Sequence, residues 1–153
     1  ASAVKLEGGT AQAATIRALA TADIPVMAHV GLKPQSVLKL GGYKVQRDER
    51  RLIDDARAAQ DAGAFGIVLE CIPASVAKVI TAELSIPTIG IGAGPDTNGQ
   101  VLVLHDLIGT NPDFSPKFLR RYADVHEIIG ASVQRYHRDV VEESFPSVEE
   151  SYG

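Results

Sequence analysis

Four side chains that can bind charge or move a proton lie near the ends of short apolar segments. Lys5 and Glu7 are two residues apart in an alternating stretch, so both would point to the same side of a β-sheet. Glu70 ends a longer apolar run, where partial loss of solvent would raise its pKa towards the range of a general base. His29 also follows three apolar residues. These positions predict a site with one amine, two carboxylates and an imidazole.

Each of these residues also fits a simpler structural role. Lys5 and Glu7 would have the same spacing in an exposed ion pair on an edge strand. Glu70 would fit as a cap for the N-terminus of the following helix. A single His at a strand end, such as His29, is more often a hydrogen-bonded core residue than a catalyst. Spacing does not separate these alternatives.

Three other sequence features give weaker evidence for a functional site. The glycine-rich segment 90–95 departs from a dinucleotide fingerprint because Pro95 stands where the third Gly is required. Cys71 has no evident activating neighbour and is predicted to be a small packed apolar residue. Basic and acidic residues alternate within 47–57, which is typical of a solvated helix face and not of a nucleic-acid site.

Composition narrows the class of protein. The chain has 153 residues, is 45% hydrophobic and carries a formal net charge of −4. This composition fits a globular domain and disfavours nucleic-acid or membrane binding through bulk charge. A single Cys excludes an intrachain disulfide. No apolar run is long enough for a membrane span, and no signal segment opens the chain, so we expect a cytoplasmic location.

Short apolar strands alternate with helical patterns along the chain. Strands are predicted at 3–7, 25–30, 65–70, 88–91 and 101–104. Helices are predicted over 11–20 with Thr10 as N-cap, over 47–62 ending at Gly63, after Pro73, and over 118–140. Segment 31–46 is predicted to be a long loop and a candidate lid. We expect one domain over 1–141 and a solvated acidic tail over 142–153.

This alternation predicts an α/β fold with a parallel sheet, either doubly wound or part of a (β/α)8 TIM barrel. The barrel is favoured because the polar candidates lie at the carboxyl ends of strands, the face that carries active sites in barrels. A complete barrel needs about 250 residues. The chain would then hold about the last five strands of one.

The ordered motifs resemble ketopantoate hydroxymethyltransferases. The segments are VKLEGG at 4–9, PVMAHVGLKPQS at 25–36, GGYKVQ at 41–46, VLECIP at 68–73, IGIGAG at 89–94 and QVLV at 100–103. Each motif alone is modest, but the ordered set is specific and covers nearly the whole chain. The resemblance implies a barrel of the phosphoenolpyruvate/pyruvate superfamily.

The resemblance also implies a reaction and a set of roles. The family transfers a hydroxymethyl group from 5,10-methylenetetrahydrofolate to 3-methyl-2-oxobutanoate, giving ketopantoate for pantothenate synthesis, with Mg²⁺ holding the keto acid. By similarity Lys5 and His29 bind substrate, Glu7 belongs to the metal site and Glu70 accepts the proton. The family's other metal-binding carboxylates come from earlier strands that this chain lacks.

We therefore expect an N-terminal half of the same barrel as a partner, and activity only when it is present. The resemblance further implies a homo-oligomer, typically a decamer, with the final amphipathic helix as a candidate contact. Two alternatives stay open. One is another Mg²⁺-dependent lyase or mutase of the superfamily that acts on a keto acid. The other is a non-catalytic half-barrel that serves as a structural subunit.

Overall fold

The computed structural model describes every residue except 37, 39–41 and 43. The chain forms two compact units, Ala1–Val101 and Leu102–Gly153. None of the helices in the described residues is long and apolar enough to cross a membrane. The first unit is α/β, as predicted, and contains all four candidate site residues.

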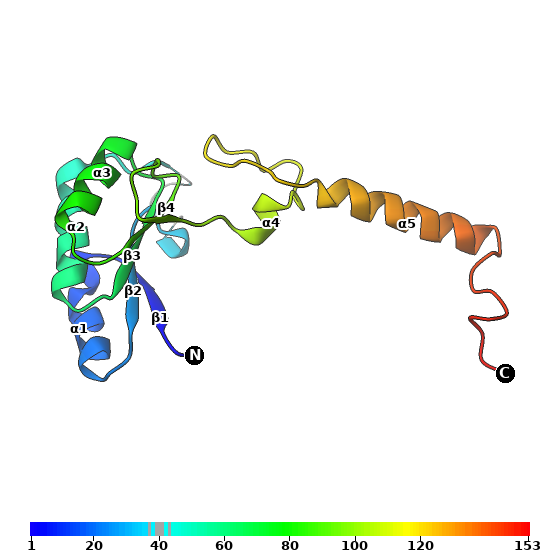
Figure 1. Ribbon diagram of the computed structural model, residues 1–153, viewed down its shortest axis with the longest axis horizontal. Coiled ribbons are helices and arrows are strands. Elements are labelled where there is room, and N and C mark those ends of the chain that lie inside the picture. Colours follow the sequence, from blue (N-terminus) through cyan, green and yellow to red (C-terminus); the bar gives the residue numbers. More distant parts are fainter. Residues whose placement is uncertain (37, 39–41, 43) are drawn as a thin grey trace. The chain divides into compact units, whose positions relative to one another are not determined.

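The first unit is built on a parallel sheet whose spatial order repeats the chain order, β1-β2-β3-β4-β5 (Figure 1). Its strands are β1 (Val4–Glu7), β2 (Val26–Gly31), β3 (Gly66–Glu70), β4 (Thr88–Ile91) and the short β5 (Gly99–Gln100). All neighbouring pairs are parallel. The first four strands confirm the sequence prediction, since each is a short apolar run between turn residues.

Helices α1 (Ala13–Thr21), α2 (Glu49–Asp61) and α3 (Ala74–Glu83) lie on one side of this sheet (Figure 1). A short 3-10 turn, η1 (Thr10–Gln12), precedes α1, and a second, η2 (Pro34–Ser36), follows β2. Alternate strand residues such as Ala28, Ile67 and Leu69 are fully buried in one core with Ala56 and Ile80 of the helices. This apolar packing fixes which strand residues face the helices and which face the opposite side.

The ends of α2 follow the sequence signals closely. The Asp48 carboxylate accepts a hydrogen bond from the Arg51 backbone N–H at 3.1 Å, which caps the first turn. Gly63 follows the last turn with φ +102°, the conformation that only glycine adopts without strain. The predicted C-terminal glycine is therefore confirmed.

Thr10 does not cap α1, which corrects the prediction. It lies in η1, and the residue before α1 is Gln12, which makes no side-chain capping bond. The Thr10 backbone N–H instead donates to Asp55 Oδ1 at 2.8 Å. This bond ties the Thr10 backbone to α2, and α1 begins at Ala13 instead of at residue 11, with Thr10 inside η1.

The predicted strand at 101–104 is also wrong. Pairing with β4 ends where the Val101 N–H donates to Gly90 O, and α4 (Leu104–Leu107) begins soon afterwards. β4 ends at Ile91, and Gly92 follows with φ +64°, so no strand backbone continues for further pairing. An apolar run without an adjacent strand edge cannot extend the ladder.

In the second unit the helix predicted over 118–140 is shorter at its start. α5 spans Val125–Val141, and Tyr122 lies before it with its N–H donating to Leu107 O at 2.8 Å. The Arg121 guanidinium holds the preceding segment as a loop. Its Nη2 donates to the backbone carbonyls of Asn111, Pro112 and Phe114 at 2.7–3.1 Å.

Candidate active site

The four candidate residues come together on three adjacent strands. β1 supplies Lys5 and Glu7, β2 supplies His29 and β3 supplies Glu70. The pairing register sets Glu7 beside His29 and Gly31 beside Glu70. Since their neighbours in each strand pack on the helices, these side chains point to the sheet face that α1–α3 do not cover.

Glu70 ends β3 and is partly withdrawn from solvent, with a side chain 17% exposed. Burial raises the pKa of Glu70, with a smaller lowering by the charge of Lys5 and a further increase from Glu7. The alternative capping role is not observed. The residue before α3 is Pro73, and within the described residues the start of α3 has no side-chain capping bond. A carboxylate with a raised pKa is suited to accept a proton near neutral pH.

His29 is almost completely buried, with 1% exposure. Its Nε2 lies 2.6 Å from the Leu32 carbonyl oxygen and 3.4 Å from Glu70 Oε2. Burial lowers the pKa of His29, against the opposing effect of its bond to Leu32. The imidazole is thus both a hydrogen-bonded interior residue and a direct neighbour of Glu70, so the two alternatives raised by the sequence are compatible.

Lys5 and Glu7 lie at the first strand but do not form an ion pair with each other in the described part of the chain. The Glu7 Oε2 accepts a hydrogen bond from the Gln35 backbone N–H of η2 at 3.1 Å. Lys5 is exposed. Its positive charge acts on both Glu70 and His29, lowering the pKa of each. The positive charge of Lys5 therefore acts directly on the pKa of the candidate base, Glu70.

The backbone around Glu70 contains contacts that the sequence analysis missed. The Leu32 N–H donates to Glu70 O at 2.8 Å, and the Cys71 N–H donates to Ile91 O at 2.9 Å. Gly31 has φ +98°, and a Cβ there would overlap the Glu70 carbonyl oxygen. Cys71 itself adopts φ +50°, a strained value for a residue with a side chain. The only signal in the sequence was the glycine directly after the second strand.

Cys71 is half-buried, and burial raises the pKa of its thiol, followed by the effect of the Glu70 charge. A raised pKa keeps the thiol protonated and unreactive at neutral pH. Cys71 was predicted to be a small packed apolar residue, and in the structure it is only partly packed.

The described residues do not form a complete metal centre. No group of three or more His, Cys, Asp or Glu side chains is close enough to hold an ion in the part of the chain that the structure describes. Mg²⁺ in proteins commonly takes one or two carboxylates and keeps several waters. Glu7 has one oxygen bonded to Gln35 N–H, and its carboxylate fits a partial contribution of this kind.

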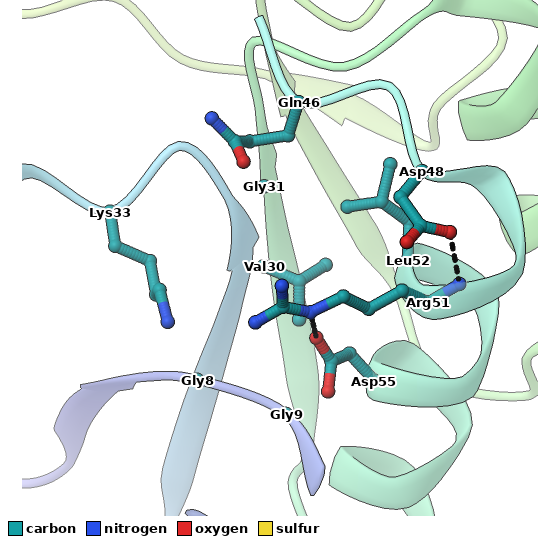
Figure 2. Close-up of a pocket in the computed structure, with 10 residues that line it drawn as sticks. All are labelled: Gly8, Gly9, Val30, Gly31, Lys33, Gln46, Asp48, Arg51, Leu52 and Asp55. Atoms are coloured by element: carbon teal, nitrogen blue, oxygen red, sulfur yellow. Dashed lines mark hydrogen bonds and ion pairs between the residues drawn. The ribbon is translucent and has the colours of Figure 1, made fainter. Parts of the chain in front are cut away.

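A small pocket that none of the four candidate residues lines lies between the Gly8–Gly9 turn and the start of α2 (Figure 2). Lys33 and Arg51 extend over it, and Arg51 Nε lies 3.8 Å from Asp55 Oδ2. Gly9 packs so closely on Asp55 that a Cβ would overlap the α2 backbone. The charged face of α2 is solvated, as predicted: Arg51 is exposed, and Asp55, which also lines the pocket, is half-buried.

Comparison with known proteins agrees with the motifs. The sequence profile of the family described as ketopantoate hydroxymethyltransferase matches residues 1–148. The chain belongs to the ketopantoate hydroxymethyltransferase family. Proteins named 3-methyl-2-oxobutanoate hydroxymethyltransferase are 54% identical in Geobacter metallireducens and 56% identical in Pelobacter propionicus, with 99% of this chain aligned in each case.

The chain spans 58% of the length of both relatives. Membership of the ketopantoate hydroxymethyltransferase family confirms the predicted resemblance, and the five-stranded parallel sheet agrees with a barrel-type family. The structure brings Glu7, His29 and Glu70 onto neighbouring strands, with Lys5 two residues before Glu7. Their individual roles stay predictions. The lid predicted over 31–46 includes residues outside those described.

Proposed function

We propose that this chain carries the proton-transfer part of a 3-methyl-2-oxobutanoate hydroxymethyltransferase active site. The observation that supports this most directly is the position of Glu70. Its carboxylate lies at the carboxyl end of β3, partly desolvated, on the same sheet face as Lys5 and Glu7. A base in this setting can remove a proton from a carbon acid whose anionic oxygens are held by a neighbouring cation.

In the proposed reaction Glu70 accepts the proton from C3 of 3-methyl-2-oxobutanoate. The electron pair of the C–H bond moves into the adjacent ketone and forms an enolate. Water releases the bridging carbon of 5,10-methylenetetrahydrofolate as formaldehyde, which breaks its two C–N bonds and leaves tetrahydrofolate. C3 of the enolate then bonds to this carbon, and the alkoxide that forms takes the proton from Glu70 and becomes the hydroxyl group of the product. Taken together these steps balance as keto acid, methylene donor and water giving ketopantoate and tetrahydrofolate.

Lys5 is proposed to bind the keto acid, since an ammonium group acts as a compact positive charge for carboxylate and carbonyl oxygens. Glu7 is proposed to contribute to the Mg²⁺ site directly or through water. When bound, Mg²⁺ stabilises negative charge on the substrate oxygens. His29 lies 3.4 Å from the carboxylate of the base.

We further propose that the sheet is part of a (β/α)8 barrel. Two features support this: the strands are uniformly parallel, and helices cover one face while the polar site residues occupy the other. The longer relatives leave room for the remaining strands and for further Mg²⁺ ligands. In this proposal the full protein works in the cytoplasm as a homo-oligomer, with α5 contributing to subunit contacts.

The deciding experiment is C3–H exchange of 3-methyl-2-oxobutanoate in D₂O, followed by proton NMR, with the full-length protein and Mg²⁺. The folate donor is unnecessary for this half-reaction. Glu70→Gln should retain substrate binding but lose exchange by about 100-fold or more, since a general base commonly contributes that much. Glu49→Gln, an exposed carboxylate on α2, serves as the matched control. Exchange that persists in Glu70→Gln would remove Glu70 from this role.

A further inference from the structure

We propose that His29 is a positioning residue for Glu70, with its Nε2–H held at the Leu32 carbonyl so that the imidazole faces the Glu70 carboxylate. The proposal rests on the proposed function, in which Glu70 is the base, and adds a second residue to that site. It is carried by the arrangement of three groups: the His29 imidazole, the Leu32 peptide and the Glu70 carboxylate.

The position of the imidazole proton follows from its neighbours. The two oxygens facing Nε2, Leu32 O at 2.6 Å and Glu70 Oε2 at 3.4 Å, are a carbonyl and a carboxylate oxygen. Both are hydrogen-bond acceptors when Glu70 is ionised, so Nε2 must carry the proton. Nδ1 is buried and has no hydrogen-bond partner within the described residues. A proton on Nδ1 would therefore be a buried donor without an acceptor, which is costly.

Three contacts link His29, Leu32 and Glu70 to one another. The Leu32 N–H donates to the Glu70 backbone carbonyl at 2.8 Å, and the Leu32 carbonyl accepts from His29 Nε2. The same Nε2 faces the Glu70 carboxylate. The peptide group of Leu32 therefore binds both the backbone of Glu70 and the His29 imidazole that faces the Glu70 side chain. The imidazole that faces the carboxylate is itself held in place by its hydrogen bond to Leu32 O.

The unequal distances explain how His29 can orient the base without weakening it. A contact of 3.4 Å is longer than a good N–H···O hydrogen bond, whereas 2.6 Å to Leu32 is short. The donor is mainly engaged by the carbonyl, so the carboxylate is oriented but not stabilised as in a close ion pair. No hydrogen bond to the other oxygen, Oε1, is formed by the described part of the chain, which leaves that oxygen free to accept a proton.

Two amide substitutions of His29 in the full-length protein distinguish the roles of the two imidazole nitrogens. The side-chain nitrogen of His29→Gln can reach the place of Nε2, whereas that of His29→Asn falls nearer Nδ1. We expect His29→Asn to lower kcat for C3–H exchange by about 100-fold, the scale of a misplaced catalytic group, with little change in KM. His29→Gln should recover at least about one-tenth of the activity. Equal loss in both variants, or an effect on KM alone, would overturn the proposal.

Nitrogen-15 NMR of the imidazole provides a test that does not depend on turnover. In the wild-type protein at neutral pH, the Nε2 of His29 should be protonated and its Nδ1 bare. The Nε2–H resonance should shift in Glu70→Gln and stay in place in Glu49→Gln. A protonated Nδ1, or a resonance insensitive to Glu70, contradicts the positioning role. Absence of C3–H exchange in the wild type with these NMR results intact would instead contradict the proposed function.

Discussion

Gly31 lies beside Glu70 across the β2–β3 pairing, and its missing side chain lets the Glu70 carbonyl oxygen approach the β2 backbone. This approach permits the 2.8 Å bond from the Leu32 N–H to Glu70 O. The carboxylate of Glu70 and the backbone that carries it are thus held by one turn. A glycine without chemistry of its own consequently determines where the candidate base lies.

Gly31→Ala should therefore lower both stability and activity. An alanine at φ +98° is strained, and its Cβ would overlap backbone atoms that cannot move aside easily. We expect the free energy of unfolding to fall by about 2–4 kcal/mol, a range typical of backbone strain combined with a clash. Urea denaturation of the full-length protein measures this change.

Gly42→Ala is the matched control for that substitution. Gly42 also has a positive φ, +108°, but among the described residues no atom lies within 4 Å of the place where its Cβ would be. It should show only the conformational cost, about 1 kcal/mol. Equal destabilisation by the two substitutions would show that the close approach of the Glu70 carbonyl to Gly31 does not contribute to the free energy of unfolding.

The pH dependence of stability should carry opposite contributions from the two buried titratable groups. The pKa of Glu70 is raised on folding, so its contribution to stability is lost as pH rises above its ordinary value near 4.5 and becomes constant above the raised pKa. Glu70→Gln removes this loss. The variant should be more stable than the wild type near neutral pH, relative to their difference at pH values below 4.5.

His29 acts in the other direction, since burial lowers its pKa on folding. Its neutral form is favoured in the folded state, so stability should fall as pH decreases below the ordinary value near 6.5 and level off below the lowered pKa. His29→Gln should flatten this part of the profile. Chemical denaturation at a series of pH values measures both effects. A His29→Gln profile parallel to the wild type throughout this range would contradict the lowered pKa.

Substitutions of Lys5 and Glu7 should affect different steps of binding. Lys5→Met should raise KM for 3-methyl-2-oxobutanoate by about 10-fold or more, equivalent to the loss of one charge-assisted contact of about 1.5 kcal/mol. Glu7→Gln keeps an oxygen that can accept from the Gln35 N–H, but removes the charge. It should raise the Mg²⁺ concentration needed for half-maximal exchange. Steady-state exchange rates at varied Mg²⁺ and keto acid separate these outcomes.

The same titrations include the result that would reverse these assignments. A change in Mg²⁺ dependence in Lys5→Met, with none in Glu7→Gln, would place the metal contact elsewhere. Removal of Mg²⁺ with a chelator should abolish exchange in the wild type, and added Mg²⁺ should restore it.

The apolar stripe of α5 is exposed within its own unit, with Ile129, Val133, Tyr136 and Val140 all at least 43% accessible. Helical spacing places these residues on one face. If this face contributes to subunit contacts, Val133→Glu should reduce the assembly size of the full-length protein. Gln134→Glu adds the same charge at an exposed position outside this apolar stripe and should leave the size unchanged. Light scattering after size-exclusion chromatography measures both; an unchanged mass in Val133→Glu would contradict the contact.

The comparison of sequence with structure shows which signals are local. The first four strands and the end of α2 at Gly63 were predictable because hydrophobic runs and glycine conformations depend on nearby residues. The apolar run at 101–104 was wrongly predicted as a strand because pairing depends on where the neighbouring strand ends. The start of α5 was misplaced because Arg121 binds carbonyls up to ten residues away.

The site divides in the same way. Lys5, Glu7, His29 and Glu70 could be selected from residue type and their place at strand ends. Their proximity depends on the parallel register, which a single sequence does not specify. The bond from His29 to Leu32 and the approach of Glu70 to Gly31 depend on the turn after β2. These contacts could not be predicted from the sequence, because they combine backbone dihedral angles with the pairing of two strands.

The sheet order, which repeats the order of the chain, has a consequence for how such a gene can be recombined. A continuous stretch of coding sequence specifies a continuous sector of the sheet with its covering helices. A crossover between two related genes in the loop at 84–87, between α3 and β4, would transfer Lys5, Glu7, His29 and Glu70 as one inherited block. Chimaeras joined there would keep the acid–base geometry of one parent while sampling the C-terminal sequence of another.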